Sequence, residues 1–240
     1  MTATPAQKQL LDLLLSETEA AAAKAQALVV FDLDDTLFLT ANRHLRILHE
    51  YAAAIEARHP EAASLLRAIE REKLRYAVTD TVKDAGLADD LARDLKDFWF
   101  ARFFKNPYLL EDDATHGGPA FVEEVVKRGG QAVYMTGRDE EMRAGTEGSL
   151  KKHGFILDGK RGRLFLKPRF DTPDVQFKAE CVAKLKDMGL VTGTFENEPA
   201  HVNLFAEGFP QARHFLLETK HSGKPVVPHP AAHRIRHFGR

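Results

Sequence analysis

Acidic, hydroxyl and basic residues lie beside several apolar segments of the chain, near the points where those segments begin or end. The residues placed in this way are Asp32, Asp34, Thr136, Gly137, Lys178 and Glu196. Two acids two residues apart on an extended segment point in the same direction. Clustered carboxylates typically bind a hard cation such as Mg²⁺ through oxygen. The first pair, Asp32 and Asp34, therefore indicates a cation site.

This combination of residue types suits phosphoryl transfer. A carboxylate can attack phosphorus and form an aspartyl-phosphate, which splits one difficult step into two. The phosphoryl oxygens then need neutralising partners, which a cation, a lysine ammonium, a threonine hydroxyl and backbone N–H groups supply. The leaving oxygen needs a proton from a nearby acid. All of these groups must converge on one edge of the fold.

The elements that would position them alternate between helix and strand. Apolar periodicity predicts helices over 5–25, 118–128, 139–153, 174–188 and 199–207, and strands over 27–31, 131–135, 163–167, 191–196 and 212–217. Repeated β-α-β crossovers predict an α/β fold, a Rossmann-like parallel sheet with helices on both faces. Ligands bind such open sheets at the carboxyl ends of the strands.

One long segment, residues 37–115, interrupts this alternation and is helical in pattern. We predict helices over 41–58, 61–76 and 89–104. The chain would then divide into an α/β core of residues 1–36 and 116–240 and an inserted helical unit of residues 37–115. The unit contains a run of aromatic residues: Phe98, Trp99, Phe100, Phe103 and Phe104. We interpret this run as packing within the unit, and the alternative is that one or two rings line a substrate pocket.

The first acidic motif resembles that of a known family. Residues 31–37 read Phe-Asp-Leu-Asp-Asp-Thr-Leu, which is similar to the first motif of the haloacid dehalogenase superfamily, Asp-x-Asp-x-Thr after hydrophobic residues. Thr136, in Met-Thr-Gly-Arg-Asp, matches the second motif. A lysine and then an acidic group complete the order, and Lys178 and Glu196 meet these positions. The resemblance covers residues 27–217 and points to the phosphatase branch.

The resemblance implies a role for each matching residue. Asp32 would be the nucleophile and Asp34 the general acid/base, while Thr136 and Gly137 would bind the phosphoryl group. Mg²⁺ would be held by Asp32, Asp34 and Glu196. The catalytic lysine would be Lys178.

Two positions leave alternatives open. Lys167, at the end of a predicted strand, competes with Lys178 for the role of the phosphate-neutralising lysine. The family usually carries Asp at its last metal position, whereas this chain offers Glu196, Asn197 and Glu198. We favour Glu196 because it ends a predicted strand.

The function implied is that of a Mg²⁺-dependent phosphatase, which hydrolyses a small phosphomonoester through an aspartyl-phosphate. A phosphotransferase or phosphomutase of the same superfamily and a catalytically silent binding protein are the alternatives. A dehalogenase is disfavoured, because those enzymes lack the second Asp. The insertion directly after the first motif resembles a mobile helical cap over the active site, in which Asn42, Arg43 and Arg46 either face the leaving group or lie on the surface.

The composition and charge of the chain limit its possible partners and its location. The 240 residues include 34 Lys and Arg and 35 Asp and Glu, a net charge of -1 that argues against a nucleic-acid partner. One cysteine, Cys181, excludes an internal disulfide, and the sequence shows no apolar run of about 20 residues that would span a membrane. We therefore expect a cytoplasmic protein with a small phosphorylated substrate; the oligomeric state is not indicated. Three tail histidines spaced by four, His229, His233 and His237, are expected in a packed or partly disordered tail, because nearby prolines disfavour a helix.

Overall fold

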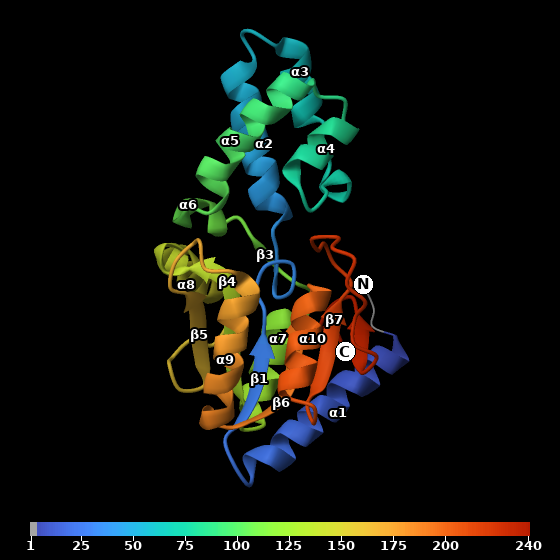
Figure 1. The fold of residues 1–240 in the computed structure, drawn as a ribbon, viewed down its shortest axis with the longest axis vertical. Helices are drawn as coiled ribbons and strands as arrows, with labels where there is room; N and C mark the ends of the chain where they lie inside the picture. Colours follow the sequence, from blue (N-terminus) through green and yellow to red (C-terminus); the bar gives the residue numbers. More distant parts are fainter. Residues whose placement is uncertain (1–3) are drawn as a thin grey trace.

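The computed structural model describes residues 4–240, and its centre is a six-stranded parallel sheet (Figure 1). The strands lie in the order β5-β4-β1-β6-β7-β8, so the chain builds outward from β1 on one side and then on the other. Their bounds are β1 Ala27–Phe31, β4 Gln131–Asp139, β5 Gly162–Lys167, β6 Leu190–Glu196, β7 Arg213–Leu217 and β8 Ala232–Ile235. The direction of building reverses at β1, which places a ligand crevice at its carboxyl end.

The apolar run of β1 is buried on both sides, as its lack of alternation predicts. Val29 and Phe31 face one core, where they pack against α1 (Pro5–Ala22) and α7 (Gly118–Lys127). Leu28 and Val30 face the other core, which α9 (Asp174–Met188) and α10 (Pro199–Gly208) cover. Cys181 on α9 lies in this second core, and its side chain is fully buried there. The sheet is therefore held rigid from both faces.

The helical unit lies beyond the carboxyl ends of the strands, at the top of Figure 1. It contains α2 (Ala41–Ile55), α3 (Pro60–Arg67), the 3₁₀ turn Arg71–Lys73, α4 (Val78–Asp84), α5 (Asp89–Phe103) and α6 (Asn106–Leu109). Helices α2, α3, α4 and α5 share a core of their own. The chain enters and leaves through two short antiparallel strands, β2 (Phe38–Leu39) and β3 (Asp113–Ala114). Two chain crossings thus join the unit to the sheet.

Two helix predictions differ from the structure. The helix expected over 61–76 ends at Arg67, and the following segment turns back, with the Arg75 N–H donating to the Thr81 hydroxyl at 2.8 Å. The helix expected over 139–153 begins as a 3₁₀ turn, Glu140–Met142, before α8 (Arg143–Lys152). In the second case β4 continues to Asp139, the first residue assigned to the helix.

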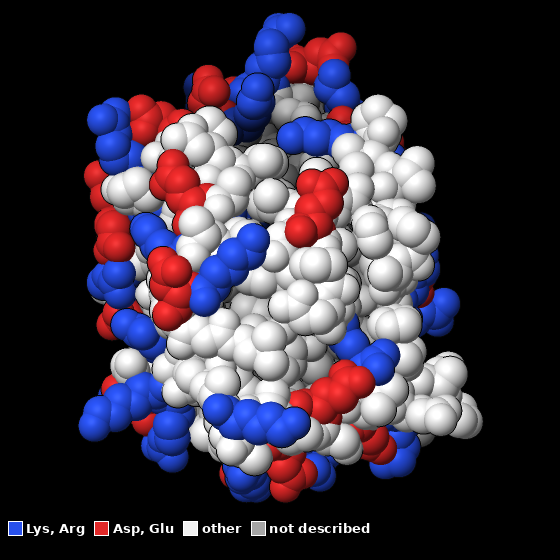
Figure 2. Space-filling model, turned by 60° about the horizontal axis from the view of Figure 1, so that its bottom comes forward, with Lys and Arg blue, Asp and Glu red and all other residues white. Residues whose placement is uncertain are grey.

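The tail was expected to be either packed or partly disordered, and the structure shows it packed against the core. Its strand β8 extends the sheet beside β7 and was not predicted, because its four residues lie among prolines and carry no clear period. The three histidines do not gather: His233 packs on Phe215, while His237 lies beside Gln7 at 3.2 Å. On the face shown in Figure 2, acidic and basic side chains are intermixed rather than gathered by sign. No helix within residues 4–240 has the length and apolar character needed to cross a membrane.

Candidate active site

A cavity of about 390 Å³ lies between the carboxyl edge of the sheet and the helical unit. Residues from three sheet strands and from α9 reach it. Those that the sequence singled out are Asp32, Asp34, Thr136, Gly137, Lys178 and Glu196, and all six line this one cavity. The convergence expected from the strand order is therefore present.

Asp32 lies at the carboxyl end of the central strand β1 and lines the cavity. It follows β1 directly, its backbone N–H donates to the Phe195 carbonyl at 3.0 Å, and its side chain is buried. Carboxylate oxygen Oδ1 accepts a hydrogen bond from Lys178 Nζ at 2.8 Å. Burial and the neighbouring Glu196 raise the pKa of Asp32 to about 8, and Lys178 opposes that rise. The Lys178 ammonium is thus the protein group that favours the ionised form of Asp32.

Lys178 joins Asp32 to a second buried carboxylate. Its Nζ also donates to Glu196 Oε2 at 2.5 Å, while Glu196 Oε1 accepts the backbone N–H of Asn197 at 3.0 Å. Burial alone would raise the pKa of Glu196, but Lys178 and His201 together outweigh it and lower the value to about 2. We refer to Asp32, Lys178 and Glu196 as the lysine cluster.

The competing lysine lies elsewhere. Lys167 pairs with Asp174 at 2.9 Å and donates to the Phe170 carbonyl at 3.0 Å. Its nitrogen therefore holds the loop between β5 and α9. Of the two lysines, Lys178 is the one that contacts Asp32.

Asn197 and Glu198, the two alternatives to Glu196, form hydrogen bonds with residues of the tail. The Asn197 amide donates to the Lys220 carbonyl at 2.5 Å, and the Glu198 carboxylate accepts from the backbone and hydroxyl of Ser222 at 2.5 and 2.8 Å. Only Glu196 shares a hydrogen-bond partner with Asp32 among these three. Glu196 is also the residue that ends β6, and its role in holding a cation stays a prediction.

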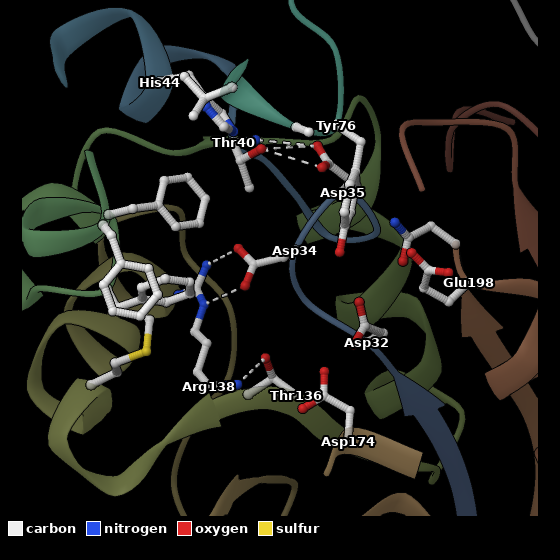
Figure 3. Close-up of a pocket in the computed structure, with 18 of the residues that line it drawn as sticks. Asp32, Asp34, Asp35, Thr40, His44, Tyr76, Thr136, Arg138, Asp174 and Glu198 are labelled. Atoms are coloured by element: carbon white, nitrogen blue, oxygen red, sulfur yellow. Dashed lines mark hydrogen bonds and ion pairs between the residues drawn. The ribbon is translucent and has the colours of Figure 1, made fainter. Parts of the chain in front are cut away.

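The structure places the Asp34 carboxylate away from this pair. Figure 3 shows Asp34 turned towards Arg138, with Asp32 apart from both. Arg138 binds the two Asp34 oxygens through Nε at 3.0 Å and Nη2 at 2.7 Å, and Arg43 binds Oδ1 at 2.7 Å. Burial would raise the pKa of Asp34, but the two guanidinium groups outweigh it and lower the value. The Asp34 side chain does not join Asp32 and Glu196 as a cation ligand in this arrangement.

Asp112 completes a second buried group of charges, which the sequence did not reveal. It accepts from Arg43 Nε at 2.8 Å and from Arg138 Nη2 at 2.8 Å, and it is fully buried. We refer to Asp34, Arg43, Asp112 and Arg138 as the arginine cluster. Arg43 lies at the start of the helical unit and Asp112 at its end, so charged residues flanking the insertion were the available signal.

Thr136 and Gly137 line the cavity from strand β4. Thr136 is buried, and its hydroxyl accepts the Arg138 backbone N–H at 3.2 Å. A Cβ at Gly137 would lie 2.7 Å from the Asp174 carboxylate, so a side chain there would clash. Glycine therefore allows the Asp174 carboxylate to lie against the backbone at this position.

The donor set fits Mg²⁺. Mg²⁺ commonly binds one or two protein carboxylates together with substrate phosphate and water. Asp32 and Glu196 supply two carboxylates against the single ammonium of Lys178, so with both acids ionised a bound cation would balance the remaining negative charge. No group of three His, Cys, Asp or Glu side chains suited to a metal occurs within residues 4–240, so any cation here relies on this pair.

No family model and no curated protein matches the sequence. Solved structures do match. A Clostridium difficile protein assigned as a phosphatase aligns with a TM-score of 0.55 at 14% identity, over 84% of this chain and 89% of that chain. A haloacid dehalogenase superfamily hydrolase of subfamily IA from Geobacter sulfurreducens aligns with a TM-score of 0.52 at 12% identity, over 91% and 94%. The chain has the haloacid dehalogenase fold.

A third structure with this fold, a Thermotoga maritima protein assigned as a β-phosphoglucomutase, aligns with a TM-score of 0.50 at 16% identity, over 88% of this chain and 94% of that chain. At such identities the likeness concerns the haloacid dehalogenase fold alone. It confirms the Rossmann-like α/β class predicted from the sequence. The chemistry must be argued from the residues in the cavity.

Proposed function

We propose that this protein is a Mg²⁺-dependent phosphatase that hydrolyses a small phosphomonoester through an aspartyl-phosphate on Asp32. The observation that carries the proposal is the buried Asp32 carboxylate at the end of the central strand, bound by Lys178 at 2.8 Å and facing a cavity. A buried carboxylate held by an ammonium beside phosphate-binding groups suits nucleophilic catalysis. The haloacid dehalogenase fold supports the same assignment.

The cavity residues would act in the following way. Lys178 binds Asp32 Oδ1, so we assign the attack on phosphorus to Oδ2. The Lys178 ammonium, the Thr136 hydroxyl and the Gly137 N–H would hold the phosphoryl oxygens. Mg²⁺ bound by Asp32 and Glu196 would add positive charge next to the phosphoryl group.

Asp34 would exchange the proton with the leaving oxygen and later with the attacking water. Its side chain is 36% exposed and lines the cavity, so rotation about its own bonds can bring the carboxylate towards the substrate. It must first leave Arg138 and Arg43. The arginine cluster therefore holds Asp34 in a resting position in this proposal.

We further propose that residues 37–115 form a cap on a core of residues 1–36 and 116–240. The cavity lies between the two parts, and the paired strands β2 and β3 are the connection about which the cap would move. A cap that closes excludes water and contacts the organic part of the substrate. A small phosphorylated molecule fits a cavity of this size.

The test is phosphate release from p-nitrophenyl phosphate with and without Mg²⁺. Asp32→Asn keeps the shape and removes the nucleophile, so turnover should fall by about 10³-fold or more. Asp187→Asn, on the exposed end of the same α9 that carries Lys178, is the matched control and should retain the wild-type rate. Acid quenching should trap labelled phosphate on the wild-type enzyme. An Asp32→Asn variant as active as the wild type would overturn the proposal.

A further inference from the structure

Helix α5 carries more apolar surface than its own unit covers. Leu95 and Phe98 face the core of the helical unit, with Leu95 fully buried. Trp99, Phe100 and Phe103 lie on the neighbouring face and line the cavity. A surface helix normally shows one apolar stripe towards one core. The second stripe of α5 lines the cavity, while Phe98 and Trp99 pack against the core of the unit, so packing within the unit describes only part of the run and the pocket-lining alternative describes the rest.

The rings of this second stripe are fixed before any ligand binds. Trp99 stacks on Phe103 with ring centroids 4.3 Å apart and on His44 at 5.5 Å, and its indole N–H donates to His44 Nδ1 at 3.1 Å. Burial lowers the pKa of His44 to about 3, so a neutral imidazole accepts that hydrogen bond. Phe104 packs edge-on against Phe103 at 5.1 Å. We call His44, Trp99, Phe103 and Phe104 the aromatic wall.

Further rings stand half exposed at the mouth of the same cavity. Phe100 is 51% and Tyr76 54% exposed, and both line it. Phe170, from the loop after β5, packs against Phe104 at 5.0 Å and Phe100 at 5.6 Å, so the sheet side contributes a ring as well. Apolar rings that gather at a cavity mouth mark a surface that a ligand covers.

We propose that the aromatic wall binds the organic part of the substrate, and that this part is a planar aromatic ring. The inference rests on the proposed phosphatase function and names its substrate class: a small phosphomonoester with one aromatic ring system. The phosphoryl group would lie over Asp32 and the ring against the wall, within one cavity of about 390 Å³. Aromatic rings prefer stacked or edge-on contacts, which a saturated ring of the same size cannot reproduce.

Direct binding tests this without any turnover. Trp99 is the single tryptophan of the chain, so its fluorescence reports on the wall. Wild-type protein in Mg²⁺ buffer is titrated with 2-phenylethylphosphonate, 2-cyclohexylethylphosphonate and ethylphosphonate, which cannot be hydrolysed. We expect the phenyl compound to bind about tenfold more tightly than the cyclohexyl compound and to change the Trp99 emission. Equal affinities for these two would overturn the inference.

Variants of the aromatic residues show which rings produce the preference for the phenyl compound. Phe104→Leu keeps an apolar side chain but removes a ring of the wall, and it should reduce the phenyl preference towards one while ethylphosphonate binding stays the same. Phe100→Leu, on the exposed rim, repeats the test if Phe104→Leu fails to fold. Phe98→Leu is the matched control, since this ring lies on the same helix but packs against Tyr51 in the helical unit. A preference that survives both Phe100→Leu and Phe104→Leu rules the wall out.

Turnover separates this inference from the function on which it rests. Phosphate release is compared for 2-phenylethyl phosphate and ethyl phosphate, which share a primary alkoxide leaving group. Equal kcat/KM values for the two esters would support the phosphatase function but contradict the aromatic substrate class. Ring preference in binding with no phosphate released from either ester overturns the phosphatase and the substrate class together, while the wall remains a ligand site.

Discussion

Two buried groups of charges, whose acids Asp32 and Asp34 lie two residues apart, differ in their balance. The lysine cluster sets two carboxylates, Asp32 and Glu196, against one ammonium. The arginine cluster sets two carboxylates against two guanidinium groups. The first is short of positive charge when both of its acids are ionised. The second is internally neutral and joins the helical unit to the sheet.

The difference indicates what each cluster can do. Buried charge is costly unless it is paired, so an incomplete cluster is a place where a cation or another charged ligand gains from binding. A complete cluster gains nothing from a further ion and acts by fixing the geometry of its members. Asp34 belongs to the complete cluster in this conformation, although the motif places it beside Asp32.

The largest expected effect comes from breaking the complete cluster. Arg43→Met leaves Asp112 buried without one of its two partners, so the free energy of unfolding should fall by about 3–5 kcal/mol. Urea denaturation of the variant and the wild type measures this. The paired variant Arg43→Met with Asp112→Leu removes both charges and should recover most of the loss. A double variant that is less stable than the single one would show that the balance of charge is not what matters.

A smaller effect on stability is expected when Mg²⁺ binds to the lysine cluster. Mg²⁺ at one hundred times its dissociation constant should raise the unfolding free energy by about 2.7 kcal/mol. Glu196→Gln, which removes a carboxylate from the lysine cluster, should abolish this gain. Asp112→Asn, which removes one from the arginine cluster, should keep it. The affinity is taken from calorimetry, and an identical response from both variants would contradict the assignment of the cation to Asp32 and Glu196.

Most of the α/β sheet could be predicted from the sequence, because its strands are apolar runs buried on both faces. Such runs at 27–31 and 132–135 stand out locally, and the order of the strands along the chain determines which edges meet. Strand β8 was missed because its four residues are half exposed and lie among prolines. Its position is determined by contact with β7, which no local pattern encodes.

The site divides in the same way. Residues that directly follow strands were brought together as expected, since the sheet itself positions Asp32, Thr136 and Glu196. The orientation of Asp34 was not predictable, because it depends on Arg43 and Asp112, which lie on either side of the long insertion. The cavity-facing side of α5 was also hidden. A wide apolar stripe indicates that a helix face is covered, but it does not indicate whether protein or a ligand covers that face.

His44, a buried imidazole outside both clusters, should make a smaller contribution to the free energy of unfolding, and this contribution should depend on pH. Burial and the neighbouring Arg43 lower the pKa of His44 to about 3, against about 6.5 when unfolded. The neutral form is favoured in the folded state, so its contribution is complete above pH 6.5 and is lost as the pH falls towards 3. Between pH 7 and pH 5 the loss should be about 2 kcal/mol. His44→Gln should lack this component in urea denaturation, and equal pH dependence of both proteins would contradict it.

The smallest effect is expected from an ion pair with good geometry but no burial. Arg67 binds Glu56 through two hydrogen bonds of 2.7 Å, a bidentate arrangement like that of Arg43 with Asp112. The two side chains are 40% and 55% exposed, so water already solvates both charges and salt screens them. Arg67→Met should therefore leave the midpoint of urea denaturation unchanged within error. A loss comparable to that of Arg43→Met would mean that geometry, rather than burial, sets the strength of these pairs.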